Sequence, residues 1–196
     1  MTYSLTVPGN FVERFEMHYL RYVSALLGSV LLLGAPAASA QADSVAATRL
    51  VTAMRIDDVT LLGLRLGLQR GIRDGKTSPK TLECVSKLDR MTFAPVFAQA
   101  IAANMSAQEI ASSTAFFESA PGRKYIDSGI YQLYDAVGFT SPDPEPKISE
   151  ADMQAVTAFS RTPAGDKLLV KRIFDSAEIR GAIGARIQQV LNGCSQ

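Results

Sequence analysis

The residues of this sequence that could do acid–base chemistry are carboxylates and lysines, because the single histidine, His18, lies close to the N-terminus. Serine and cysteine nucleophiles are usually activated by a histidine, and many zinc sites use one as a ligand. No glycine-rich phosphate-binding loop is present either. The sequence therefore predicts no catalytic residues, no metal site and no bound cofactor.

The acidic residues are better explained by helix starts than by a catalytic pair. Asp57 and Asp58 are adjacent at a predicted helix start, where negative charge interacts favourably with the helix dipole. Glu109 and Asp152 each follow a serine by three residues, which is the spacing of a capping box. Because some hydrolases need only two carboxyl groups, a histidine-free hydrolase that uses carboxylates stays the alternative to a protein without enzymatic activity.

Cys84 and Cys194 are the two cysteines of the chain. An even pair of this kind in an exported protein predicts a disulfide between them. Neither cysteine belongs to a Cys-x-x-Cys motif, which disfavours a thioredoxin-like redox function. Two free or metal-bound thiols are the other interpretation.

The N-terminal 40 residues have the organisation of a signal peptide. A weakly basic start precedes an apolar run at residues 23–33, which is shorter than the ~20 residues that span a bilayer. Ala-Ser-Ala at 38–40 is a small-x-small cleavage pattern, so we expect cleavage after residue 40, with Met17 as an alternative start of the chain. The expected product is a periplasmic or secreted protein with a single domain over residues 41–196.

The composition agrees with a folded domain. Of the 196 residues, 47% are hydrophobic and 20% are charged, which excludes the low-hydrophobicity, high-charge composition of disordered chains. The formal net charge is only +1, so bulk electrostatics give no reason to expect a nucleic acid partner.

Apolar residues recur at spacings of three and four and predict an all-α fold, a single bundle of about seven or eight helices. Ser44 is predicted to cap the first helix, and the second is expected to run from Asp57 or Asp58 to Arg73. Ser78 and Pro79 predict the start of the third helix, which is expected to carry Leu88 and to be kinked or restarted at Pro95. The last helix should begin near Asp175 or Ser176 and end at residues 192–193. The expected buried stripes are Ala47, Leu50, Val51 and Met54 in the first helix, and Ile179, Ile183, Ile187, Val190 and Leu191 in the last.

An internal repeat with a spacing of 43 residues predicts two helix-turn-helix hairpins inside this bundle. The copies lie near residues 105–140 and 148–175, and a proline-rich connector at 141–147 separates them. Matching residues are Ser106 and Ser149, Phe116 and Phe159, Gly122 and Gly165, and Lys124 and Lys167.

Residues 159–167 resemble the aromatic, Ser/Thr-Pro-x-Gly-x-Lys signature of the domain of unknown function 2059 family. The residues that match are Phe159, Thr162, Pro163, Gly165 and Lys167, and in the first copy Phe116, Gly122 and Lys124. The proline of the first copy, Pro121, stands one position later than that of the second, which raises the question of whether the two turns have the same geometry. The resemblance implies an exported bacterial helical protein and no catalytic residue.

Several residues of the two copies are candidates for binding. Lys124 and Lys167 follow the predicted turns and could receive an anionic ligand, although a solvated lysine, or one lying across a neighbouring helix, is the simpler interpretation. Phe116 is expected to anchor the core, as is its counterpart in the second copy. Tyr131 and Tyr134 are neighbours on a helix surface whose expected buried stripe is Ile126, Ile130, Leu133 and Val137. Tyr134 borders that stripe and Tyr131 lies further round, and we treat the two tyrosines as a candidate binding surface, with plain packing as the alternative.

Two stripes of small residues predict a close helix contact. Gly63, Gly67 and Gly71 recur every four residues in the second helix, and Ala177, Gly181 and Ala185 do so in the last. Because small side chains let helix backbones approach closely, these stripes predict that the two helices cross, within one chain or across a homodimer. The other interpretation is that each stripe faces bulky side chains of some other helix.

These observations lead to one functional hypothesis and its alternatives. The leading hypothesis is a non-enzymatic helical envelope protein that binds another protein, a peptide or an apolar ligand in a groove between helices. The enzymatic alternative requires two carboxylates in one concave pocket. A structural homo-oligomer is the third reading and requires a large exposed apolar patch.

Overall fold

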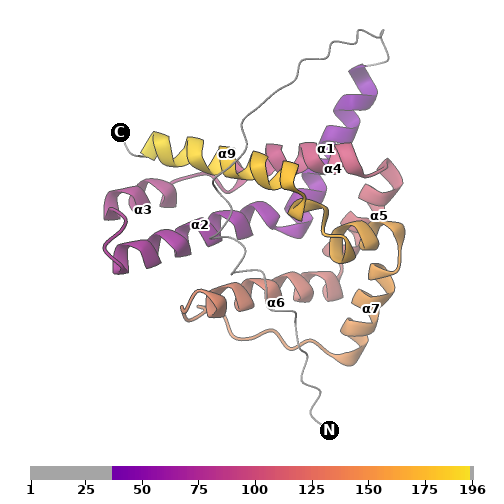
Figure 1. The fold of residues 1–196 in the computed structure, drawn as a ribbon. Helices are drawn as coiled ribbons and strands as arrows, with labels where there is room; N and C mark the ends of the chain where they lie inside the picture. The colour runs from indigo at the N-terminus through magenta and orange to yellow at the C-terminus, as the bar shows by residue number, and fades with distance from the viewer. Residues whose placement is uncertain (1–36, 195–196) are drawn as a thin grey trace. The chain divides into compact units, whose positions relative to one another are not determined.

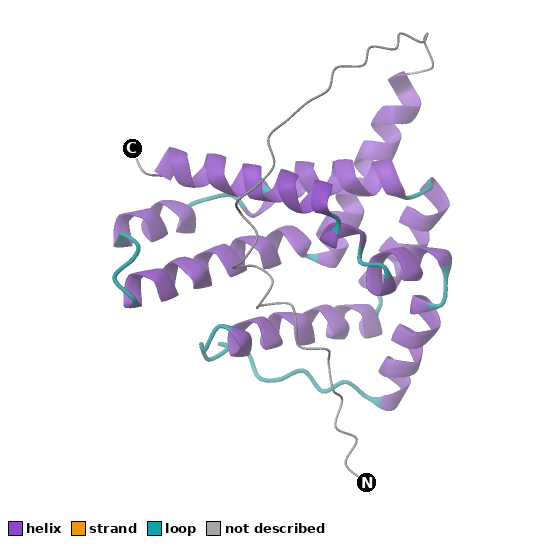
Figure 2. Cartoon of the chain, in the orientation of Figure 1, coloured by secondary structure: helices purple, strands orange, loops and turns teal. Residues whose placement is uncertain are grey.

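A computed structural model describes the backbone of residues 37–194 and the side chains of residues 44–194. Every regular element of this part of the chain is helical, and it contains no strand (Figures 1 and 2). The α-helices are α1 (Ala37–Met54), α2 (Ile56–Arg73), α3 (Pro79–Ser86), α4 (Ala94–Asn104), α5 (Ala107–Glu118), α6 (Ala120–Ala136), α7 (Glu150–Ser160), α8 (Pro163–Gly165) and α9 (Ala177–Cys194). The short turns η2 (Arg90–Thr92), η3 (Asp166–Val170) and η4 (Ile173–Asp175) join them. The predicted all-α class is confirmed for the described residues. The predicted signal peptide lies mostly outside them.

The helix starts follow the local signals of the sequence. Ser78 accepts a hydrogen bond from the backbone of Lys80 at the start of α3, and Pro79 occupies the first turn. Ser106 and Glu109 form a complete capping box at the start of α5. Ser149 and Asp152 form another at α7, so an aspartate reaches back to the cap backbone here as a glutamate does at α5.

The core forms around α1, which packs against α4 and α5 (Figure 1). Leu50 and Val51 of α1 are fully buried, and the large side chains that meet them include Phe97, Ile101 and Phe117. All four residues predicted for the buried face of the first helix are buried. In α9 Ile179 is buried, while the other four residues of its predicted stripe are half-buried against the same core.

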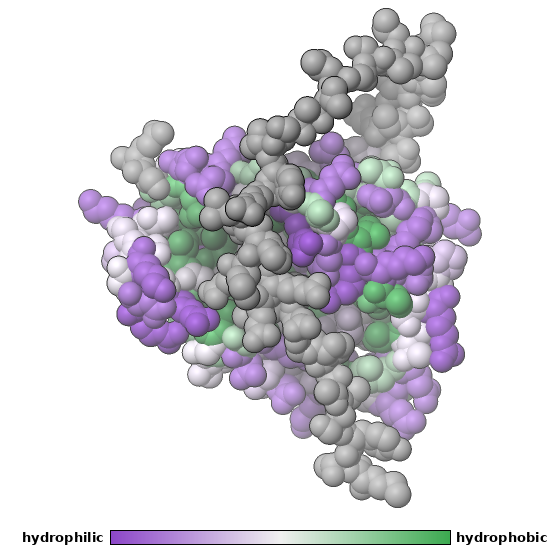
Figure 3. Space-filling view, viewed as in Figure 1, coloured by the Kyte–Doolittle hydropathy of each residue, from purple (hydrophilic) through white to green (hydrophobic). Residues whose placement is uncertain are grey.

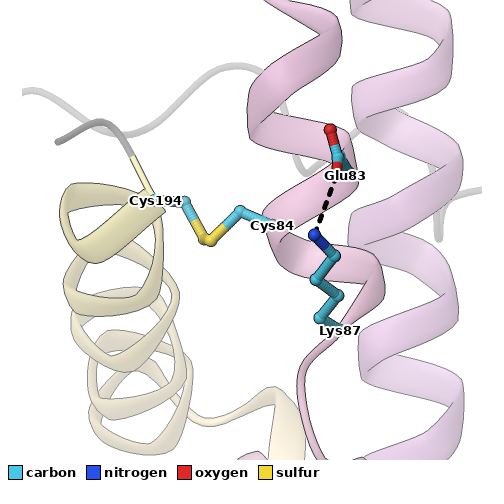
Figure 4. Close-up of a disulfide and its surroundings, with 4 residues drawn as sticks. All are labelled: Glu83, Cys84, Lys87 and Cys194. Carbon is cyan, nitrogen blue, oxygen red and sulfur yellow. Dashed lines mark hydrogen bonds and ion pairs between the residues drawn. A yellow bond between two sulfur atoms is a disulfide. The ribbon is translucent and has the colours of Figure 1, made fainter.

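Helix α9 packs against α3 and α4, and the Cys84–Cys194 disulfide ties its last residue to α3 (Figure 4). The two Cα atoms are 5.6 Å apart, within the range that a disulfide can bridge. The predicted pairing of the cysteines is therefore confirmed.

Helices α2 and α6 lie side by side and run in the same direction. Arg55, directly before α2, pairs with Asp127 of α6 at 2.8 Å. Further along, Gly63 faces Leu133, and the guanidinium of Arg73 lies 5.1 Å from the ring centre of Phe139. Three contacts in the same order along both helices thus define one seam.

Some predicted boundaries are wrong. Helix α1 begins at Ala37, so Ser44 lies inside it and is not its cap. Helix α3 ends at Ser86, so Leu88 lies in the connection and not in the third helix. Helix α4 restarts with Pro95 in its first turn, which is one of the two outcomes expected at this proline. Helix α9 continues through Cys194, beyond the predicted stop.

The predicted crossing of the glycine stripe with the last helix is also wrong within this chain. A methyl group added at Gly67 would meet no atom within 4 Å, and Gly71 faces Thr77 of the following turn. On α9, Gly181 likewise faces open space. Glycines at every fourth position would permit a close helix contact, but α9 packs on α3 and α4 instead of on this face of α2.

The second helix differs in length between the two predicted hairpins. Helix α6 has 17 residues, whereas α8 has three and is followed by the five-residue π-helical segment η3. The connector at residues 141–147 contains no helix, as its prolines predict. None of the described helices is both long and apolar enough to cross a membrane.

Candidate functional site

The turns between α5 and α6 and between α7 and α8 make the same local hydrogen bonds. Ser119 caps α6 by accepting a bond from the Gly122 amide at 3.3 Å, and its hydroxyl donates to the Phe116 carbonyl at 2.5 Å. In the other turn the Thr162 hydroxyl accepts from Gly165 at 3.0 Å and donates to the Phe159 carbonyl at 2.7 Å. The offset of the two prolines therefore leaves the bonding of the turns unchanged.

Both turns bring a glycine against the end of the preceding helix. A Cβ atom on Gly122 would collide with the carbonyl oxygen of Phe116, and one on Gly165 would collide with that of Phe159. Backbone atoms supply both obstacles, so a side chain cannot be accommodated by a rotamer change. This is the physical reason for glycine at these two motif positions.

The lysine after each turn reaches the capping-box acid of the other hairpin. Lys124 Nζ lies 2.7 Å from Asp152 Oδ2, and Lys167 Nζ lies 2.8 Å from Glu109 Oε2. Lys167 also donates to the carbonyl of Asn104 at the end of α4. The two crossed ion pairs therefore fasten the start of each hairpin to the turn of the other.

These contacts lower the pKa of both carboxyl groups. The hydrogen bond from Lys124 is the largest cause for Asp152, followed by those from Ser149, and together they bring its pKa to about 2. The hydrogen bond from Lys167, then that from the Ser106 backbone, lowers the pKa of Glu109. Both acids are ionised at neutral pH and cannot act as proton donors there. Both lysines lie across a neighbouring helix and pair with a carboxylate there, which agrees with the simpler interpretation of these residues.

Aromatic rings fill the space between the two turns. Phe116 and Phe159 stack with ring centres 4.0 Å apart and planes inclined by 8°. Phe117, which is fully buried, meets both rings edge-on. The two motif phenylalanines therefore anchor the packing between the hairpins, as predicted.

Tyr131 and Tyr134 lie on the C-terminal half of α6 and are half-buried. Ile130, Leu133 and Val137 beside them are also half-buried. None of these five side chains belongs to the main core, which α6 reaches only through Tyr125 and Ile126. We call these five residues the α6 surface.

Asp57 is a buried carboxylate in the first turn of α2, only 2% exposed. Burial is the largest cause that raises its pKa. Arg55 stands at the cap position with a left-handed backbone, and its side chain makes no capping hydrogen bond. Asp57 and Asp58 thus lie in the first turn, as the dipole argument predicts, but neither is the cap.

Two surface hollows are candidates for a ligand site. One, of about 400 Å³, is lined by α7, and the other, of about 560 Å³, lies on α3 beside Cys84. The first contains the carboxylate of Glu150, and the second that of Glu83, which pairs with Lys87 at 2.8 Å. Neither hollow brings two carboxylates together. Within residues 44–194 no cluster of three or more histidine, cysteine, aspartate or glutamate side chains could hold a metal ion.

Sequence reasoning missed the crossed ion pairs and the α7 hollow. A signal for the ion pairs was present, because the lysine and the capping-box acid share the repeat spacing of 43 residues. A signal for the hollow was present too, since its lining residues follow the three- and four-residue spacing of one helix face.

Comparisons with known proteins add no relative to this description. No protein-family model matches the chain, and neither the curated proteins nor the solved structures contain a match. The resemblance to the domain of unknown function 2059 family therefore stays a prediction from the motif residues alone.

Proposed function

We propose that this chain is an exported, non-enzymatic binding module that contacts a protein or peptide partner through the α6 surface. The observation that supports the proposal most is the incomplete burial of α6. Gly122 is the one buried residue of its 17, although the helix contains two isoleucines, a leucine and three tyrosines. Tyrosine at the margin of an apolar surface is typical of protein interfaces.

The chemistry of the described residues also favours binding over catalysis. Glu109 and Asp152 are engaged in ion pairs that hold them ionised. Asp57 has the raised pKa of an acid catalyst, but its side chain is buried and its neighbour Asp58 faces Arg55 at 3.7 Å. A carboxylate hydrolase needs a second carboxyl group in the same accessible pocket.

We further propose that the two hairpins are copies of one unit. Support comes from residues 43 apart that make equivalent contacts: the caps Ser106 and Ser149, the stacked phenylalanines, the turn glycines and the crossed lysines. The shortened second arm of the second copy is the main departure from this equivalence.

Export is the third part of the proposal. The Cys84–Cys194 disulfide supports it, because disulfides form and persist in oxidising compartments. Cleavage after residue 40 would fall within α1 and leave Ala47, Leu50, Val51 and Met54, the residues described as buried in this helix, in the exported chain. N-terminal sequencing of the protein from an envelope fraction tests this part. A first residue other than Gln41 would contradict the proposed cleavage.

The binding proposal is tested by comparing partner capture by three forms of the exported protein. In the first variant Tyr131 and Tyr134 are both replaced by alanine. In the control the exposed neighbour Gln132 is replaced by alanine instead. Native mass spectrometry of each form purified from its envelope should find a partner in a defined ratio with the wild type and the control, and at least ~10-fold less with the tyrosine variant.

Two further measurements make this test decisive. Thermal unfolding must show that the tyrosine variant is folded at the temperature of purification. A partner held equally by all three forms would contradict the proposed surface. Covalent turnover of a copurified small molecule by the wild type would contradict the non-enzymatic proposal.

A further inference from the structure

The outer face of α7 is a helix surface that no other described element covers. Helix α7 buries Asp152, Val156 and Phe159 on its inner side, against α6, α8 and η3. Its outer side lines the hollow of about 400 Å³, and none of the side chains there is buried. The lining residues are Glu150, Met153, Gln154, Thr157, Ala158 and Arg161. We call these six residues the α7 face.

The charges of the α7 face are separated along the helix. Glu150 stands at the first position of α7, and Arg161 is the residue that ends it. Arg161 forms no ion pair with any residue whose side chain the structure describes. Glu150 accepts only a long 3.4 Å bond from Gln154. Both charges are therefore available to a partner.

The face is complementary to itself when two copies pack antiparallel. Aligning Glu150 with Arg161 of a second copy places Met153 opposite Ala158 and Gln154 opposite Thr157. Each of these pairs fits: opposite charges, a large side chain against a small one, and an amide against a hydroxyl. A parallel arrangement would instead place Glu150 against Glu150 and Arg161 against Arg161. Only the antiparallel arrangement satisfies all three pairs.

We propose that the α7 face is a homodimer surface, on which a second copy of this chain docks antiparallel about a two-fold axis that passes between Gln154 and Thr157. A two-fold contact uses the same patch on both subunits and closes, so it forms dimers and not filaments. One helix of 11 residues is about 16 Å long and makes an interface below the standard size. We therefore expect a weak dimer, in the class of transient interfaces.

Sedimentation equilibrium of the exported protein, from ~1 to ~500 μM, tests this proposal through charge reversal. Arg161→Glu and Glu150→Arg each set like charges against each other and should weaken dimerisation at least ~10-fold. The double variant Glu150→Arg with Arg161→Glu restores opposite charges and should recover the wild-type constant within ~3-fold. Arg180→Glu, on the exposed side of α9, makes the same charge change elsewhere and should have no effect.

The three substituted positions, Glu150, Arg161 and Arg180, are exposed, so circular dichroism should report the same fold for each of the four variants. A wild-type chain that is monomeric over the whole concentration range would overturn the proposal. The α7 face would then remain open to binding by a different protein. A dimer that Arg161→Glu does not weaken, or that the double variant does not recover, would place the contact elsewhere and would overturn it equally. These outcomes do not depend on the α6 surface, so this test and that of the binding function fail separately.

Discussion

Inside α5, Ser113 and Thr114 are neighbouring buried hydroxyl residues with different surroundings. The Thr114 hydroxyl donates to the carbonyl of Ile110 at 2.8 Å. The Ser113 side chain is fully buried, yet its oxygen has no hydrogen-bond partner. A buried polar group without a partner costs roughly 1–3 kcal/mol, so this serine destabilises the helix packing that surrounds it.

We expect Ser113→Ala to raise the free energy of unfolding by roughly 1 kcal/mol, because the desolvated hydroxyl is removed and alanine favours the helix. Thr114→Ala is the matched change at a hydroxyl that is bonded, and it should lower the same free energy. Urea unfolding followed by circular dichroism measures both. A loss of stability in Ser113→Ala would mean that the hydroxyl makes a favourable contact.

The ion pair of Lys124 with Asp152 should be visible in the pH dependence of stability. A carboxyl group with a lowered pKa stabilises the folded state above its unfolded pKa, and this contribution disappears as the pH falls through the folded pKa. For Asp152 the window runs from the ordinary value of 3.8 down to about 2. Acidification through this window should therefore destabilise the protein.

Replacing Lys124 by methionine removes the largest cause of the low pKa. The variant should be less stable at pH 7, and its melting temperature should fall less steeply between pH 4 and pH 2 than that of the wild type. Lys80→Met, at an exposed lysine of α3, is the control and should keep the wild-type profile. If the melting temperature of Lys124→Met fell as steeply between pH 4 and pH 2 as that of the wild type, this would contradict the role of the ion pair.

At the scale of the elements, the two interhelical turns depend on their glycines. Gly122→Ala and Gly165→Ala should each lower the free energy of unfolding by at least ~2 kcal/mol, because the new Cβ collides with backbone carbonyl groups. Gly129→Ala, in the same helix as Gly122 but facing open space, should instead raise it by about 1 kcal/mol through helix propensity. Urea unfolding of the three variants tests the contrast. Equal effects at all three positions would be inconsistent with a close approach at the turns.

Local signals predicted the elements well, whereas the contacts between elements were harder to predict. The capping boxes at Ser106 and Ser149 involve residues within one turn, so the sequence alone determines them. The crossed ion pairs join residues 28 and 58 positions apart, and their formation depends on how the hairpins pack. The helix crossing predicted from the glycine stripe of α2 was wrong for the same reason. The spacing of the glycines identifies a helix face but not the element that packs against it.

The candidate binding surface on α6 could likewise be predicted only in part. Tyr134 was predicted to border a buried stripe and Tyr131 to lie further round, but the two tyrosines and the four stripe residues are all half-buried. The sequence did not reveal that the stripe itself is incompletely covered, since this depends on the limited packing of α2 against α6. Figure 3 shows that apolar side chains also reach the surface over the region of α2, α3 and α9. Partly covered apolar faces thus occur at more than one place in the described part of the chain.

At the scale of the whole described chain, the first and last helices are stabilised differently. Helix α1 is surrounded by α4 and α5 and has three fully buried residues, Ala47, Leu50 and Val51. Helix α9 has a single buried residue, Ile179, and rests on the core with half-buried side chains. Because packing holds α9 less firmly than α1, the disulfide at its last residue should contribute substantially to the docking of α9.

The last prediction concerns this disulfide, which closes a loop with a sequence separation of 110 residues. In the loop-entropy model a bridge of this span stabilises the folded state by roughly 4–5 kcal/mol, an upper value because residual structure in the unfolded chain reduces it. Replacing Cys84 and Cys194 by serine should lower the melting temperature substantially, and dithiothreitol should do the same to the wild type without affecting the double variant further. Hydrogen exchange should then accelerate first in α9, while the fully buried part of α1 stays protected. If α9 exchanges at the same rate with and without the bond, packing alone holds the helix and the disulfide acts only on the unfolded chain.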